Sequence, residues 1–176
     1  MKKIVFWLTL MVLVIAGAAC TALVDEAEPA TMSDGVFKLS VSTDKTEYTA
    51  DEAVSCYATL EYVGGEDSMT IYSGDPLVYL TIEGGRFAGD YAINDILMTT
   101  TLSKNEPVRF DFVKSGGYGA DDEDAPFWES WFAEPQLLLP AGEYTISATV
   151  DGFFDENDYA GTAYKLTASR KITVNP

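Results

Sequence analysis

Residues 144–150 read YTISATV, and this stretch decides the fold class. Tyr144, Ile146, Ala148 and Val150 are apolar, and a hydroxyl side chain separates each of them from the next. Successive side chains of a strand point to opposite sides, so all four lie on one face of an extended chain. The stretch therefore predicts a β-strand with one face in a core and the other in water.

The same alternation recurs along most of the chain. Short runs rich in Val, Ile, Thr, Tyr and Phe are separated by Gly, Asp, Asn and Pro, which is typical of strands and turns. Clear runs cover residues 37–41, 54–61, 77–82, 108–112, 144–150 and 166–174, and weaker runs cover 69–72 and 96–102. This spacing predicts an all-β fold, an antiparallel β-sandwich of seven to nine strands. One long insertion, at about residues 114–139, precedes the 144–150 strand.

Two further segments carry a family resemblance. Residues 45–54 read KTEYTADEAV and residues 139–146 read LPAGEYTI. The first resembles the turn between strands A and B of bacterial immunoglobulin-like domains, with Asp51 in place of the usual glycine. The second resembles the entry to their penultimate strand. The resemblance implies an immunoglobulin-like sandwich over residues 36–176. The pattern also resembles the proteinase-inhibitor branch of that fold, although residues 62–65 (YVGG) stand where that branch has an asparagine.

The first twenty residues predict the cellular address. Lys2 and Lys3 precede an apolar run at residues 4–15, small residues follow, and Cys20 comes next. A basic start, an apolar core and a small-residue cleavage zone make a secretory signal. The cysteine directly after that zone makes the segment resemble a bacterial lipoprotein signal peptide. This resemblance implies that residues 1–19 are removed and that Cys20 is lipidated.

Other interpretations of this segment are an ordinary signal cut near Ala19 and an uncut anchor, for which the apolar run is short. Residues 20–35 are polar and acidic and contain Pro29, so we expect a flexible tether between the lipid and the domain. We therefore expect an extracytoplasmic protein that is anchored to the bacterial cell membrane by its lipid.

Charge and composition exclude several function classes. Loss of Lys2 and Lys3 with the signal changes the net charge from −17 to −19. That field repels phosphate backbones, so we expect no nucleic-acid partner, and it favours a soluble monomer. The chain has no histidine, the usual general base and transition-metal ligand. We expect no catalytic residue and no enzyme activity, and we expect Cys56 to be a buried structural thiol.

Two acidic loops are candidate calcium ligands. Asp121, Asp122 and Asp124 lie in the insertion, and Asp155 and Asp158 lie in the last hairpin loop. Clustered carboxylates suit Ca²⁺ if the two loops lie at the same end of the sandwich, but neither has the spacing of an EF-hand. The competing interpretation is a pair of solvated loops on an acidic protein, and no other cofactor is expected.

An aromatic segment is the candidate ligand site. Phe127 and Trp131, and likewise Trp128 and Phe132, are four residues apart, which places each pair one helical turn apart. Such a helix either packs its rings over an open edge or end of the sandwich, or exposes a patch for a glycan or a peptide.

The ends of this helix are also predicted. Asp124 suits the N-cap, Pro126 suits the first turn, and Pro135 ends the segment.

Together these features favour a surface-tethered lipoprotein that acts as a binding or accessory module of the bacterial cell envelope. Its membrane partner is the bilayer that holds the lipid, and its ligand is an envelope protein or a glycan. The alternative is a proteinase-inhibitor-like domain directed at an extracellular protease.

The signal generates the first testable prediction. Cys20→Ala removes the thiol that would carry the lipid, so the protein is expected in the medium or as an unprocessed precursor. Triton X-114 partitioning with mass measurement of the N-terminus checks this. A Cys20→Ala protein that is processed and still enters the detergent phase would contradict lipidation.

Overall fold

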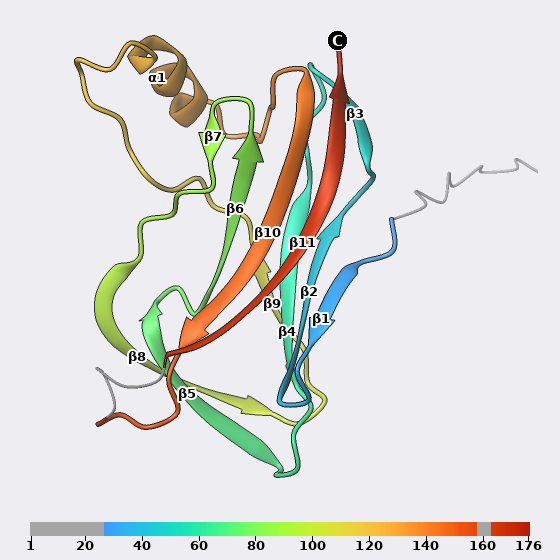
Figure 1. The fold of residues 1–176 in the computed structure, drawn as a ribbon, viewed down its shortest axis with the longest axis vertical. Coiled ribbons are helices and arrows are strands. Elements are labelled where there is room, and N and C mark those ends of the chain that lie inside the picture. The colour runs from blue at the N-terminus through green and yellow to red at the C-terminus, as the bar shows by residue number, and fades with distance from the viewer. Residues whose placement is uncertain (1–26, 158–162) are drawn as a thin grey trace, which may run out of the picture.

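The computed structural model describes residues 27–157 and 163–176, which form eleven strands and one helix arranged as packed sheets (Figure 1). One sheet has the order β1 (Ala30–Ser33), β2 (Phe37–Thr43), β4 (Cys56–Tyr62), β9 (Val108–Asp111). The second has the order β3 (Glu47–Thr49), β11 (Tyr164–Asn175), β10 (Gly142–Gly152), β6 (Val78–Gly84), β7 (Phe87–Ala88). A two-stranded sheet contains β5 (Ser68–Asp75) and β8 (Asn94–Ser103). The helix α1 (Ala125–Ala133) lies at one end, beside β7.

The central strand of the second sheet is β10, which contains the stretch that decides the fold. It pairs antiparallel with β11 on one side and with β6 on the other. Tyr144, Ile146, Ala148 and Val150 are all buried, as the alternation predicts. They share one hydrophobic core with the inward residues of the other sheet, among them Leu39, Val41, Ala58 and Leu60.

Hydroxyl side chains pair across strands on the outer face of β10. Ser147 Oγ lies 2.9 Å from Ser169 Oγ, and Thr149 Oγ1 lies 3.0 Å from Thr167 Oγ1. Cross-strand hydroxyl pairs of this kind add modest stability to an antiparallel sheet. The buried face and the paired face together confirm the all-β sandwich, in which the described strand pairs are antiparallel except for β3 with β11, which is parallel.

The two segments that carry the family resemblance each hold a buried tyrosine. Tyr48 in β3 places its hydroxyl 2.7 Å from Asp44 Oδ1, and the same carboxylate oxygen accepts from the Ser55 amide at 3.1 Å. Tyr144 donates its hydroxyl to the Pro140 carbonyl oxygen at 2.8 Å. The Tyr48 hydroxyl therefore holds the turn between β2 and β3 against β3. The Tyr144 hydroxyl holds the turn at Pro140 against the start of β10.

The strand number and the tether boundary need correction. The sandwich was expected to have seven to nine strands, but the short strands β1, β3 and β7 bring the described number to eleven. β1 lies inside the expected tether of residues 20–35, and it pairs with β2 from Ala30↔Val41 to Ser33↔Lys38. Strand pairing at an edge uses backbone groups, so it does not require the apolar alternation that the prediction depended on.

In the two described ranges, no helix combines the length and the apolar character that a bilayer span requires. The expected signal at residues 1–19 and Cys20 lie outside the described residues.

The core generates a prediction about Cys56. Its thiol is unpaired and 7% exposed, and burial, assisted by the negative charge of Asp44, raises its pKa to about 12. The thiol therefore stays protonated and unreactive near neutral pH. Cys56→Ser is expected to lower the free energy of unfolding by about 1–3 kcal/mol, because a hydroxyl is costlier to bury than a thiol.

Mass spectrometry of maleimide-treated protein checks this prediction, because the label is read on the peptide that contains Cys56. Labelling should be slow in buffer and fast in denaturant. Fast labelling of the native protein would place Cys56 outside the core.

Candidate functional site

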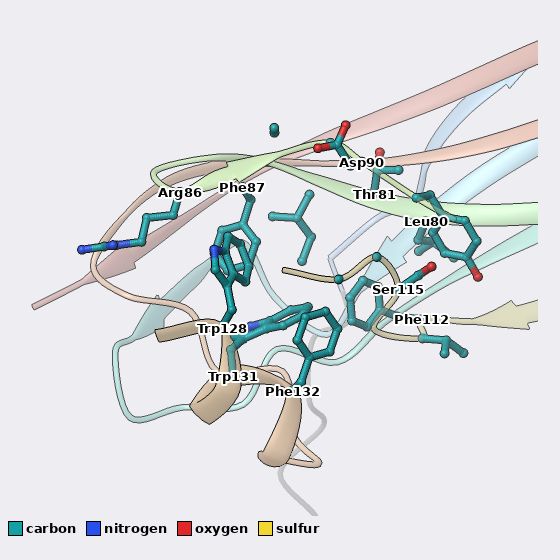
Figure 2. A pocket seen from close by; sticks show the side chains of 17 residues that line it. Leu80, Thr81, Arg86, Phe87, Asp90, Phe112, Ser115, Trp128, Trp131 and Phe132 are labelled. Atoms are coloured by element: carbon teal, nitrogen blue, oxygen red, sulfur yellow. The ribbon is translucent and has the colours of Figure 1, made fainter. Parts of the chain in front are cut away.

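The β6–β7 hairpin builds one wall of the candidate site. Gly84 has φ +132°, and a Cβ at this position would lie 2.4 Å from the Glu143 carbonyl oxygen, so glycine is required here. This close approach to β10 lets the chain turn back through Gly85 and Arg86. The turn directs Phe87 toward the insertion, where it faces the rings of α1 (Figure 2).

The helix α1 builds the opposite wall. The Phe127 and Trp128 amides donate to the Asp124 carbonyl oxygen at 3.0 and 3.1 Å, which begins the helix. Pro126 lies in the first turn as predicted, and the backbone is already extended at Glu134, the residue before Pro135. Asp124 is the N-cap residue, as predicted, but its side chain makes no cap hydrogen bond and instead forms an ion pair with Arg86.

An aromatic cluster joins the two walls. The Phe87 ring centroid lies 5.4 Å from Trp128, 5.4 Å from Trp131 and 6.0 Å from Tyr144. Trp131 is 9% exposed and belongs to the core, whereas Phe127, Trp128 and Phe132 are partly buried against it. The four predicted aromatic residues therefore do come together, and three of them keep some exposed surface.

Lys114 fastens the far end of the helix. Its ammonium donates to the carbonyl oxygens of Trp131 and Glu134, each at 2.5 Å, and lies 4.5 Å from the centroid of the Trp131 ring. A cation at a helix C-terminus is favourable because the last carbonyls have no partner in the helix. Burial lowers the pKa of Lys114, and the neighbouring Glu134 carboxylate opposes this shift.

A small cavity lies between these walls. We name it the aromatic pocket; its volume is about 130 Å³, and Figure 2 shows the side chains around it. Trp128, Trp131 and Phe132 line it from α1, and Phe87 and Ala88 line it from β7. The remaining lining residues are Leu80, Thr81, Ile82, Arg86, Gly89, Asp90, Tyr91, Phe112, Val113, Ser115, Gly116 and Gly117.

A more polar depression continues from the aromatic pocket, and we name it the adjoining groove. It is lined by Asp75, Pro76, Tyr79, Asp111 and other residues, and it shares Leu80, Tyr91, Val113, Ser115 and Gly116 with the aromatic pocket. Tyr79 and Tyr91 stack with centroids 4.9 Å apart at its side. The two depressions therefore form one continuous surface at the edge of the sandwich.

The proposed calcium ligands do not come together. Asp121, Asp122 and Asp124 precede β10, and Asp155 follows it, while Asp158 lies outside the described residues. An 11-residue strand separates its two ends by roughly 33–37 Å, and Figure 1 places α1 and the β10–β11 turn at opposite ends of the sandwich. In residues 27–157 and 163–176, no group of three or more His, Cys, Asp or Glu residues is arranged to hold a metal ion.

Several pocket residues were missed in the sequence. Phe87 lies in a two-residue strand, too short to show a period, and about forty residues before the helix that it contacts. Lys114 and Arg86 gave no signal either, because their roles depend on carbonyl and carboxylate groups that only the folded chain brings near. The glycine pairs at residues 84–85 and 116–117 were the available signal, since glycine often marks close approach of backbone.

The cluster generates a stability prediction. Trp131→Ala removes a buried ring and leaves a cavity, so the free energy of unfolding is expected to fall by about 3–5 kcal/mol. Glu129→Ala is the matched control on the same helix, because Glu129 is exposed and its loss should change stability by less than about 0.5 kcal/mol. Urea unfolding followed by far-ultraviolet circular dichroism measures both. Equal, small effects of the two substitutions would show that α1 does not contribute to the core.

Comparison with known proteins does not assign this site. No family model, no curated protein and no solved structure matches the chain. The resemblance to bacterial lipoproteins and to immunoglobulin-like domains stays a prediction from the motifs.

Proposed function

We propose that the protein is a lipid-anchored binding module of the bacterial cell envelope, held outside the cytoplasm through Cys20. Its working surface is the aromatic pocket with the adjoining groove, and its ligand is an envelope protein or a glycan. The observation that carries this proposal is the cavity between α1 and β7, where partly exposed aromatic rings line an open space. Such concave, largely apolar sites with a few polar groups are the usual form of binding sites.

The position of the site relative to the N-terminus supports the proposal. β1 and β9 are the two opposite edges of one sheet, and the adjoining groove lies beside the β9 edge, where Phe110 and Asp111 line it. A lipid on Cys20 would be ten residues from Ala30, so the chain between them spans at most about 35 Å. A tether that begins at the β1 edge leaves the groove, at the other edge of this sheet, open to an external ligand.

The chemistry of the lining favours binding over catalysis. Ser115 is engaged with the Ala92 backbone, accepting from its amide at 3.1 Å. Arg86 is paired with Asp124, and Lys114 faces the end of α1. These three side chains thus hold the walls together, and the rings supply the contact area.

The proteinase-inhibitor alternative requires an exposed loop that is held rigid for a protease. A turn of this kind follows β3, where the Thr49 hydroxyl donates to Asp51 and the Glu52 amide donates to the Thr49 carbonyl oxygen. We favour binding at the aromatic pocket, because a concave, ring-lined site is the more usual form of a binding site.

Photocrosslinking in intact cells tests the proposal. A photoreactive amino acid at Val113, which is 61% exposed and lines the pocket, should capture a discrete ligand. The same group at Glu66, an exposed residue of the β4–β5 turn, should not. Adding Gly117→Leu to the Val113 chain places a side chain at the rim of the pocket, where a Cβ meets no atom within 4 Å, and should abolish the crosslink while the melting temperature stays within a few degrees. Crosslinks that are equal at both positions, or that persist after Gly117→Leu, would contradict a ligand in the pocket.

A further inference from the structure

We infer that the ligand of this surface is an extended peptide segment, with one apolar side chain in the aromatic pocket and a basic side chain two positions away over the adjoining groove. This inference rests on the proposed binding function and names the class of ligand.

The size and lining of the pocket select the apolar side chain. Its volume is about 130 Å³, and an apolar cavity of roughly 150 Å³ accepts a molecule the size of benzene. A leucine or phenylalanine side chain matches this space. A sugar ring would bring hydroxyl groups against Leu80, Phe87, Trp128 and Phe132, where they lose hydrogen bonds to water.

The rim of the pocket leaves room for a second backbone. A Cβ at Gly116 or at Gly117 would meet no atom within 4 Å, so the chain here is open to close approach. No backbone–backbone hydrogen bond among the described residues involves residues 113–117. Their amide and carbonyl groups are therefore available to an extended chain, which is how peptides add to exposed backbone in many recognition domains.

The charges of the surface select the basic side chain. Asp90 lines the pocket and Asp75 lines the adjoining groove, and neither has an ion-pair partner in the described part of the chain. Two cations also line this surface: Arg86 is paired with Asp124, and Lys114 lies in the adjoining groove, held by the carbonyl oxygens of α1. Against these two cations the lining has three carboxylates, Asp75, Asp90 and Asp111, so its net charge is −1 and a lysine or arginine of the ligand is favoured over an acidic residue.

The spacing follows from strand geometry. Alternate side chains of an extended peptide point the same way and are about 6.6–6.8 Å apart. The pocket and the groove share a wall at Tyr91, Val113 and Gly116. Two side chains that are two positions apart on one face of the peptide can therefore enter the pocket and the groove at the same time.

Isothermal titration calorimetry with the full-length protein and capped synthetic heptapeptides tests the inference. The probe is Ala-Lys-Ala-Leu-Ala-Lys-Ala, in which leucine and both lysines share one face when the peptide is extended. It should bind at least about tenfold more tightly than the peptide with alanine in place of leucine, and than the peptide with glutamates in place of lysines. No preference for leucine, or none for lysine, would overturn the inference.

Matched variants locate the binding. Gly117→Leu places a side chain at the rim without backbone strain and should reduce affinity at least tenfold. Gly65→Leu is the control, because its Cβ also meets no atom within 4 Å but it lies in the β4–β5 turn. Asp90→Asn should weaken binding about threefold, and Glu66→Gln should leave it unchanged. If Gly117→Leu and Gly65→Leu reduce the affinity equally, and Asp90→Asn and Glu66→Gln do so too, the peptide does not bind at the assigned position.

Oligosaccharides separate this inference from the proposed function. If hexasaccharides of glucose or of N-acetylglucosamine bind in a manner sensitive to Gly117→Leu and the heptapeptide does not, the surface is a glycan site and the peptide inference is wrong. If no probe binds and the Val113 crosslink is also absent, the proposed function fails together with the inference.

Discussion

The burial of one face of β10 is the interaction on which the rest of the structure depends. β10 is hydrogen-bonded on both sides, and its inward residues lie in the same core as those of β2 and β4. Ile146, Ala148 and Val150 have no exposed surface at all. Because apolar burial is the main favourable term in folding, this shared layer fixes which faces of the two sheets meet.

The open edge of the sandwich explains why the insertion folds as it does. Both sheets end in short strands on that side, four residues in β9 and two in β7. The core beyond them is covered by the rings of α1, with Trp131 buried and its neighbours half-buried. The Arg86–Asp124 ion pair and the Lys114 contacts attach the two ends of the helix. Flat rings on a short helix cover such an edge incompletely, and the aromatic pocket is the space that remains.

The local sequence pattern predicted the strands and the helix better than it predicted the candidate site. Strand patterns located eight of the eleven described strands and missed β1, β3 and β7. The two prolines with the paired aromatics located α1, because these signals lie within that helix or just beyond its end. The pocket depends on contacts between segments distant in sequence, such as Phe87 with Trp128. The acidic loops illustrate the same limit, because the distance between Asp121 and Asp155 depends on all eleven residues of β10, of which the alternation showed only residues 144–150.

Several of the few cations of this acidic protein pack against aromatic rings. Arg109 lies 3.7 Å from the centroid of Tyr57, Lys45 lies 5.0 Å from that of Tyr48, and Lys114 lies over Trp131. Arg109 and Lys45 also form ion pairs with nearby carboxylates. A cation held against a ring and an acceptor is not available to a ligand. With 28 acidic and 11 basic residues in the chain, the charges that remain free at the surface are predominantly carboxylates. In the binding function proposed for this surface, an apolar pocket within such a field would discriminate among ligands by charge as well as by shape, because the field attracts basic ligands and opposes acidic ones before any contact is made.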